Sequence, residues 1–398
     1  MTATGPRTAP DADAVETVDV VALGESMVTF LPSRPGRLAD VPSFERAIGG
    51  AESNTACVLA AAGHSARWIS AVGRDGFGDH LVRAIGEYGV DVSYVRRDPH
   101  RPTGVYFRTA GDRATDAHEV AYYRAGSAAS AMTSADVDPE AVRAGRVLHL
   151  SGITAALSPG CLELVRELTA PRPGRPLVSF DVNHRPGLWR DAHGPEVLLE
   201  LARRADIVFV GDDEAESAWG IVGGPASIRE ALPEPEILVV KQGERGATAF
   251  CRTPVGSRAA ADAPSGKGAP SAPDRGTRPR QAPAAGTFVP ALAVDVVATV
   301  GAGDAFAAGF LSATLRALPV RDRLRHGHLT AAAALTVPGD LAAPPARDLA
   351  DRLAALDEAA WGRLRLGPGW TETDTADADA CTDADAGADR AEEEVRTP

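Results

Sequence analysis

Short, continuous apolar runs alternate with segments of helical pattern from residue 18 onward. The runs occupy residues 18–23, 66–72, 147–150, 177–180, 207–210 and 237–240. Each run fills consecutive positions rather than every second one, which is typical of strands covered on both faces in a parallel sheet. Residues 52–62, ended by Gly63, and residues 160–169 have the pattern of crossover helices. The alternation predicts a layered α/β domain with a central, mostly parallel sheet.

One region departs from this alternation. Residues 103–109 and 119–124 are rich in β-formers and flank a Gly-Asp pair at 111–112, which predicts an antiparallel hairpin. We expect residues from about 92 to 125, together with residues 28–46, to form a small β lid over the sheet. Lids exclude water from reactive phosphates.

Some segments lack apolar periodicity altogether. Residues 252–286 are dominated by Pro, Ala, Gly, Ser and Arg, and residues 366–398 by acidic and small residues. Such compositions bury too little apolar surface to fold. We therefore expect one domain over residues 18–365 with a disordered insert, a disordered N-terminal tail over residues 1–17 and an acidic disordered C-terminal tail. The insert and the acidic tail are expected to be solvated and peripheral to function.

Composition narrows the class of protein. With 44% hydrophobic and 24% charged residues, the chain is predicted to be globular and soluble. No apolar run reaches the length of a membrane span, and the N-terminus has no secretory-signal pattern. The four cysteines have neither metal-ligand nor disulfide-framework spacing. We therefore expect a cytoplasmic protein without a membrane partner.

The net charge of −13 is concentrated at the C-terminus. Residues 371–398 carry ten acidic residues against two arginines, which leaves a charge of only −5 on the remainder. An anion site can therefore be local, built from a few cations and a metal ion, without a basic surface. We expect no nucleic-acid partner.

The stretch Thr299-Val300-Gly301-Ala302-Gly303-Asp304 is the most informative motif. Small residues let the backbone approach a ligand, and the helical pattern that follows would direct amide groups at an anion. A carboxylate beside such a site has a role if Asp304 takes the proton of a hydroxyl during phosphoryl transfer. The alternative is a turn that only begins a helix. Neither the P-loop pattern nor the dinucleotide-binding fingerprint occurs in the chain.

Other polar groups follow predicted strands, and each has a structural and a functional interpretation. Gly49-Gly50 precedes a helix with Asn54 one turn in, either as a capped strand-to-helix turn or as an approach to polyol hydroxyls. Asp181-Val182-Asn183-His184-Arg185 is either a surface loop or a ligand-binding sheet edge. The segment 241–246, Lys-Gln-Gly-Glu-Arg-Gly, is either a glycine hairpin or a nucleotide-binding loop.

Aromatic residues and an arginine lie in the predicted lid. Strand alternation places Tyr122 and Arg124 on one face, with Tyr123 opposite, and Tyr106 lies in the other strand of the hairpin. One interpretation is an aromatic cross-strand pair with a solvated arginine. The other places Arg124 on a ligand carboxylate, for which a planar bidentate donor is well suited.

In chain order, these motifs resemble the PfkB, or ribokinase-like, carbohydrate kinase family over about residues 18 to 356. The motifs are Gly49-Gly50-Ala51 with Asn54, Asp181 with Asn183 and Arg185, Lys241 with Gly243 and Gly246, and Gly301-Ala302-Gly303-Asp304. Within the family the chain is most similar to 2-keto-3-deoxygluconate kinases. That similarity is carried by Gly24-Glu25 and by residues 122–128, 148–153, 181–183 and 339–340. The resemblance implies a three-layer α/β/α fold with a β lid, in which homo-oligomers can form through the lid.

The resemblance also implies an activity. ATP, with Mg²⁺, would phosphorylate the primary hydroxyl of a sugar acid, converting 2-keto-3-deoxygluconate to 2-keto-3-deoxy-6-phosphogluconate. Asp304 would be the base, and the amides of Gly301, Ala302 and Gly303 would stabilise the transferring group. The implied sugar contacts are Gly50, Asn54, Tyr106, Tyr122, Arg124, Arg185 and Asp340. The implied ATP contacts are Asn183, Arg185, Lys241, Gly243, Gly246, Gly301, Gly303 and His328.

Three positions depart from the family's pattern. Ala298 stands where many relatives have an Asp that helps to hold a monovalent cation, so we expect weak or absent potassium activation. Only Glu214 remains of an Asn-x-x-Glu motif near magnesium, so we expect no direct metal ligand and Glu214 to act near Mg²⁺. His328 replaces an Asn near the adenine, and its alternative is an exposed helix residue.

Two other functions stay open. A kinase for a neutral sugar such as fructose or ribose would share all the phosphate-side motifs, but two arginines suit a carboxylated substrate better. A catalytically weak sugar-binding sensor would keep the fold, but it would not need Asp304.

Overall fold

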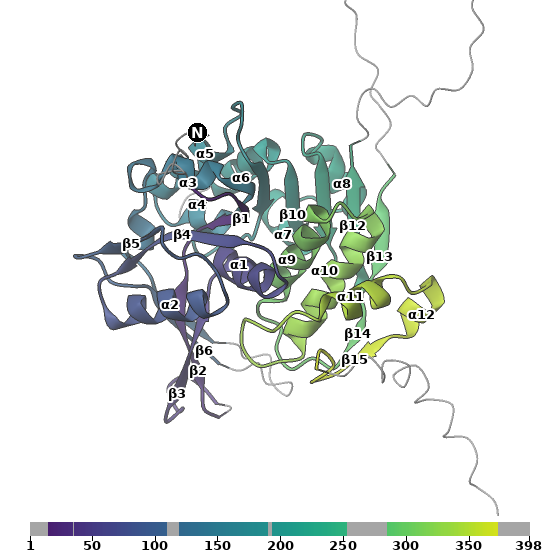
Figure 1. Ribbon diagram of the computed structural model, residues 1–398, viewed down its shortest axis with the longest axis horizontal. Coiled ribbons are helices and arrows are strands. Elements are labelled where there is room, and N and C mark those ends of the chain that lie inside the picture. The colour runs from purple at the N-terminus through teal and green to yellow at the C-terminus, as the bar shows by residue number, and fades with distance from the viewer. Residues whose placement is uncertain (1–14, 35, 110–118, 190–192, 253–284, 373–398) are drawn as a thin grey trace, which may run out of the picture.

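The computed structural model describes residues 15–34, 36–109, 119–189, 193–252 and 285–372 (Figure 1). Most of the expected insert and of both expected tails, and the Gly-Asp pair at 111–112, lie outside these residues. Among the described helices, none is long and apolar enough to cross a membrane.

Within the described residues, nine strands form the main sheet in the order β13-β12-β11-β10-β9-β8-β1-β4-β5. The strands are β1 (Val18–Leu23), β4 (Ala66–Gly73), β5 (Val95–Asp98), β8 (Gly145–Ser151), β9 (Leu177–Asp181), β10 (Ile207–Gly211), β11 (Ile237–Lys241), β12 (Gly246–Cys251) and β13 (Thr287–Pro290). Neighbours from β11 to β5 are parallel, and β12 and β13 add an antiparallel edge. All six apolar runs of the sequence form parallel strands of this sheet.

Helices cover both faces of the sheet. They are α1 (Ala51–Ala61), α2 (Gly76–Glu87), α3 (Pro139–Arg143), α4 (Gly152–Ala156), α5 (Pro159–Thr169), α6 (Gly194–Arg204), α7 (Asp212–Trp219), α8 (Pro225–Ala231), α9 (Ala302–Leu315), α10 (Val320–Leu335), α11 (Arg347–Ala354) and α12 (Glu358–Arg363). Short 3₁₀ turns occupy Ala129–Ala131, Ser134–Asp136 and Gly243–Arg245.

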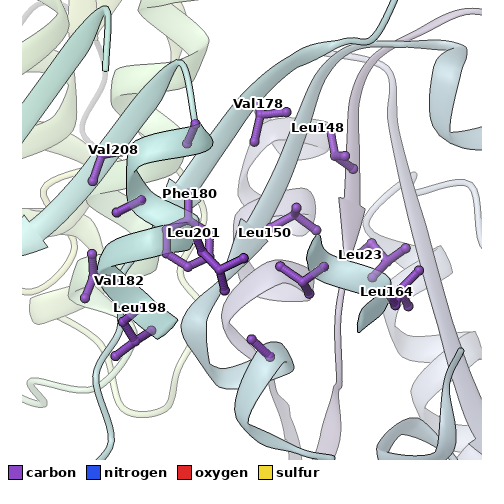
Figure 2. Packing of buried hydrophobic residues seen from close by; sticks show 14 of the residues in the cluster. Leu23, Leu148, Leu150, Leu164, Val178, Phe180, Val182, Leu198, Leu201 and Val208 are labelled. Atoms are coloured by element: carbon purple, nitrogen blue, oxygen red, sulfur yellow. The ribbon is translucent and has the colours of Figure 1, made fainter. Parts of the chain in front are cut away.

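Alternate residues of the strands enter two different cores. Leu148 and Leu150 of β8 pack with Leu164 of α5 and Leu198 of α6 on one face (Figure 2). Val147, directly before Leu148, packs on the opposite face with residues of α9, α10 and α11. Because side chains of a strand alternate between faces, both faces of the parallel strands are apolar. The predicted three-layer α/β/α arrangement is confirmed.

A second, smaller sheet protrudes from the main body at the bottom of Figure 1. Its described strands are β2 (Met27–Pro32), β3 (Phe44–Gly49), β6 (Val105–Arg108) and β7 (Val120–Tyr123), in the order β3-β2-β6-β7. β6 and β7 are antiparallel, as the sequence predicts for a hairpin, with Tyr106 opposite Tyr122. The range expected for the lid was too wide, since residues 95–98 form β5 and pair with β4 in the main sheet.

The folded part of the chain continues beyond the boundary expected at residue 365. β15 (Arg365–Leu366) pairs with β14 (Ala293–Val294), and Leu366 and Trp370 are buried in the core beside α9 to α11. The sequence did not predict this strand, because a two-residue strand and a single tryptophan produce no periodicity.

Candidate active site

The turn that begins α9 is shaped to admit an anion. Gly301 has φ of 81°, in the left-handed region, and a Cβ on it would lie 2.1 Å from the carbonyl oxygen of Asp340. Only glycine fits there. The first amides of a helix have no intrahelical acceptor and carry the positive end of its dipole. A Cβ on Gly303 would lie 3.6 Å from Lys241 Nζ, which places this cation beside the first turn of α9.

Asp304 lies in the first turn of α9 and is partly buried. Asn54 of α1 donates from Nδ2 to its Oδ2 across 2.9 Å. Burial raises the pKa of Asp304 to about 7, and the charges of Asp181 and Asp340 act in the same direction; Asn54 and Lys241 oppose them. A carboxylate with a pKa near neutrality is well matched to accepting a proton from a hydroxyl.

Lys241 and Asp181 form an ion pair at the carboxyl ends of β11 and β9. Nζ of Lys241 lies 3.0 Å from Oδ2 and 3.2 Å from Oδ1 of Asp181. Although burial lowers the pKa of Lys241, Asp181 and Glu214 raise it above its ordinary value. The lysine is therefore a fixed cation beside the α9 turn, as a site for phosphate requires.

Two residues of β6, a strand of the small sheet, bind the carboxylate of Asp340. Tyr106 donates from its hydroxyl to Oδ2 across 2.7 Å, and Arg108 donates from Nη2 to Oδ1 across 2.8 Å. A Cβ on Gly49 would lie 2.3 Å from the Tyr106 hydroxyl, so this glycine permits the contact. Sequence reasoning missed Arg108. The available signal was strand alternation, which places it on the same face as Tyr106.

Only 10% of the Arg124 side chain is exposed, and the guanidinium forms an ion pair with the buried Glu25. Ser127 donates to Oε1 of the same glutamate across 2.8 Å. The aromatic pair of Tyr106 and Tyr122 exists, with ring centroids 5.4 Å apart, but the interpretation of Arg124 as a solvated residue is wrong. Sequence reasoning gave no role to Glu25, although the Gly24-Glu25 pair was one of the motifs that carried the family resemblance.

Several buried polar atoms at this site have no hydrogen-bond partner among the described residues. They include Oδ1 of Asn54, Nε of Arg124 and Oδ1 of Asn183. An unpartnered buried polar atom is costly unless a ligand or water satisfies it. Asn183 is also held at φ of 40°, an uncommon conformation for a non-glycine residue that is enriched in asparagine. Each of these atoms is therefore available to a polar ligand or to water.

The residues that the sequence predicts for ATP binding are less closely connected with one another than the residues around Asp304. Residues 241–246 join β11 and β12 in a glycine hairpin, as one of the two interpretations of the sequence predicted. Gly243 has φ of 57° and Gly246 has φ of 134°. Arg185 is mostly exposed and lies 3.9 Å from Glu214. His328 is buried rather than an exposed helix residue: its Nε2 lies 3.2 Å from the carbonyl oxygen of Val289. Burial lowers its pKa to about 4, so it is neutral.

A magnesium ion at this site would have few protein ligands. Among the described residues, no cluster of three or more His, Cys, Asp or Glu could hold a metal ion. Mg²⁺ commonly binds substrate phosphates and water with one or two carboxylates. Glu214 is partly buried, and this burial raises its pKa. Its Oε2 accepts from the amide of Gly211 across 2.7 Å.

Comparisons with known proteins agree with this geometry. The pattern of the pfkB family carbohydrate kinases matches residues 18–265 and 280–347. A 2-dehydro-3-deoxygluconokinase of Bacillus subtilis (strain 168) is 32% identical over 345 residues, covering 85% of this chain and 96% of that protein. The probable chloroplastic fructokinase-6 of Arabidopsis thaliana is 29% identical over 341 residues, covering 82% of this chain and 79% of that protein.

A solved structure is similar in fold as well as in sequence. The crystal structure of a PfkB protein from Polaromonas sp. JS666 has a TM-score of 0.66 and 31% identity to this chain. The match covers 81% of this chain and 98% of the Polaromonas chain. The ribokinase-like fold expected from the sequence motifs is confirmed.

Proposed function

The chain belongs to the pfkB family of carbohydrate kinases, and we propose that it uses ATP to phosphorylate the primary hydroxyl of a 2-keto-3-deoxy sugar acid. The leading candidate is 2-keto-3-deoxygluconate, also called 2-dehydro-3-deoxygluconate, with 2-keto-3-deoxy-6-phosphogluconate as product. The observation that carries this proposal is the partly buried Asp304 in the first turn of α9, which accepts a hydrogen bond from Asn54 at the N-terminal end of that helix.

The proposed reaction assigns a task to each group. The sugar hydroxyl gives its proton to Asp304 while its oxygen attacks the γ-phosphorus of ATP, and the bond to the leaving ADP oxygen breaks. The amides of Gly301, Ala302 and Gly303 would donate to the transferring group, where charge accumulates. Lys241 would hold phosphate oxygens as a point charge. Mg²⁺ would neutralise phosphate charge, with Glu214 acting through bound water.

Arg124, beside the lid strands, supports a sugar acid as the substrate. The Arg124 side chain is only 10% exposed and keeps Nε without a partner among the described residues. Arg124 directly follows β7, the strand that pairs with β6. A planar guanidinium is the preferred partner of a carboxylate. The Bacillus subtilis relative, whose name specifies the sugar acid, matches over 96% of its own length.

A neutral sugar is the second candidate. Glu25 already balances the charge of Arg124, which lowers the attraction of this site for another carboxylate. Fructokinases are also among the relatives, at 29% identity.

Substrate comparison decides between these candidates. Coupled ATP turnover should be measured on 2-keto-3-deoxygluconate, its galactonate-derived epimer, fructose and ribose. We expect kcat/KM to be at least about tenfold higher for one of the two acids. In Arg124→Gln, the acid should lose about a hundredfold in kcat/KM and fructose far less, because only the acid loses a charged hydrogen bond. Equal losses on both would reject the carboxylate assignment, and fructose as the best substrate would favour the second candidate.

A further inference from the structure

Arg108 ends β6 and forms a buried ion pair with Asp340 of the main domain. Only 5% of the Arg108 side chain and 4% of the Asp340 side chain are exposed. Tyr106, two residues earlier on the same strand, donates to the other oxygen of Asp340. Both carboxylate oxygens of Asp340 are therefore fixed by one strand of the small sheet.

Asp340 in turn lies next to the reacting centre. Its carbonyl oxygen is the atom that a Cβ on Gly301 would meet at 2.1 Å. Its negative charge is one of the two that raise the pKa of Asp304. The other belongs to Asp181, which Lys241 pairs with at 3.0 Å. Each carboxylate near Asp304 thus has a cation of its own, and Asn54 is the neutral donor.

We propose that Arg108 is a positioning residue for phosphoryl transfer: it balances the charge of Asp340 and fixes that carboxylate, so that Asp304 carries its own negative charge when the sugar hydroxyl gives up a proton. This inference rests on the proposed function in one respect, the role of Asp304 as base. It does not depend on which sugar is phosphorylated.

The pair also links the base to the lid. Arg108 and Tyr106 belong to the small sheet, whereas Asp340 and Asp304 belong to the main domain. If the small sheet moved away, Asp340 would lose both partners and its charge would act uncompensated on Asp304. In a low-dielectric site such a charge disfavours ionisation of a second carboxylate. The base is therefore in its active charge state when the lid is docked.

The pH dependence of kcat/KM tests the proposal, because its acid limb reports ionisation of the base in the free enzyme. In Arg108→Gln we expect the acid limb to move to higher pH by about half a unit or more. Arg108→Lys keeps the charge and should stay close to the unmodified enzyme. Arg46→Gln is the matched control, since Arg46 is an exposed residue of β3 in the same sheet and should leave the limb unchanged.

Asp340→Asn provides a test of opposite sign. It leaves the cation of Arg108 uncompensated and should move the acid limb to lower pH, and Arg108→Gln with Asp340→Asn should return the limb toward its original position. Thermal melting verifies folding of each variant. If Arg108→Gln does not fold, the shift of the acid limb in Asp340→Asn alone decides whether the proposal holds. An acid limb that stays in place in the folded variants, whatever their rates, would assign Arg108 a packing role only and overturn the inference.

Failure of the proposed function has a different signature. If Asp304 is not the base, Asp304→Asn retains turnover and the unmodified enzyme has no acid limb near neutral pH. If Asp304→Asn is inactive and the limb exists but moves in neither Arg108→Gln nor Asp340→Asn, only the role of Arg108 is rejected.

Discussion

The side-chain amide of Asn54 donates to the carboxylate of Asp304 across 2.9 Å and joins the first turns of α1 and α9. The two residues are 250 positions apart in the chain. Oδ1 of the same side chain is buried and has no hydrogen-bond partner among the described residues. One asparagine can therefore orient the base and accept a hydrogen bond from the sugar hydroxyl.

Replacement of the base is the first prediction. Asp304→Asn keeps the size of the side chain and an acceptor for Asn54, but it cannot take a proton. We expect kcat to fall by about 10²- to 10⁴-fold, the usual contribution of a general base, while sugar binding measured by calorimetry is retained. Full turnover in this variant would contradict the kinase mechanism and favour the alternative of a sugar-binding sensor.

Removal of the orienting amide is the second prediction. The bond from Asn54 favours the charged form of Asp304 and lowers its pKa against the effect of burial. Asn54→Leu should therefore raise the pH at which half of the maximal kcat/KM is reached, and the loss of activity should be larger at pH 6 than at pH 8. A uniform loss at all pH values would show that Asn54 contacts the sugar without tuning the base.

The third prediction concerns stability rather than rate. The pKa of Asp304 is raised in the folded protein from 3.8 to about 7. Between these values the folded state binds more protons than the unfolded state, so this residue makes stability fall as pH rises. Asp304→Asn removes the dependence. Relative to the unmodified protein, it should gain up to about 4 kcal/mol between pH 4 and pH 8, measured by urea unfolding without ligands. The same difference at both pH values would contradict a raised pKa of Asp304 in the folded protein.

Potassium dependence is the fourth prediction, and it follows from Ala298. This position has no side-chain oxygen, and its backbone amide donates to the carbonyl oxygen of Leu335. We expect replacement of potassium chloride by tetramethylammonium chloride at equal ionic strength to leave kcat unchanged. A strong potassium requirement would show that backbone carbonyls alone hold a monovalent cation here.

The layers of the fold could be predicted from the sequence because strand burial leaves a local signal. Continuous apolar runs such as residues 207–210 are a consequence of coverage on both faces, and each forms a strand within one or two residues of the expected bounds. The hairpin of β6 and β7 was found for a similar reason, from β-formers on both sides of a turn signal.

Individual contacts of the site could not be predicted in this way. The sequence motif indicated Asp304 and Asn54, but their bond depends on how α1 packs against α9. Arg108, Glu25 and the burial of His328 also depend on tertiary packing, which local patterns do not encode. Strand alternation placed Arg124 on the same face as Tyr122. It could not show that Arg124 pairs with Glu25, a contact that joins the lid to the end of β1.

The C-terminal boundary supports the last prediction. The sequence places the start of the acidic tail at residue 366, but Leu366 is buried in β15 and Trp370 is 8% exposed in the core beside α9 to α11. A chain ending at residue 372 keeps both side chains and should match the full chain in Tm and kcat. A chain ending at residue 365 loses both, and because deletion of a buried tryptophan alone costs about 3–5 kcal/mol, its Tm should fall by several degrees or more. Full-length Trp370→Ala is the control that assigns this loss to packing rather than to chain length. An equal Tm for the chains ending at 365 and 372 would place Leu366 and Trp370 outside the cooperative core.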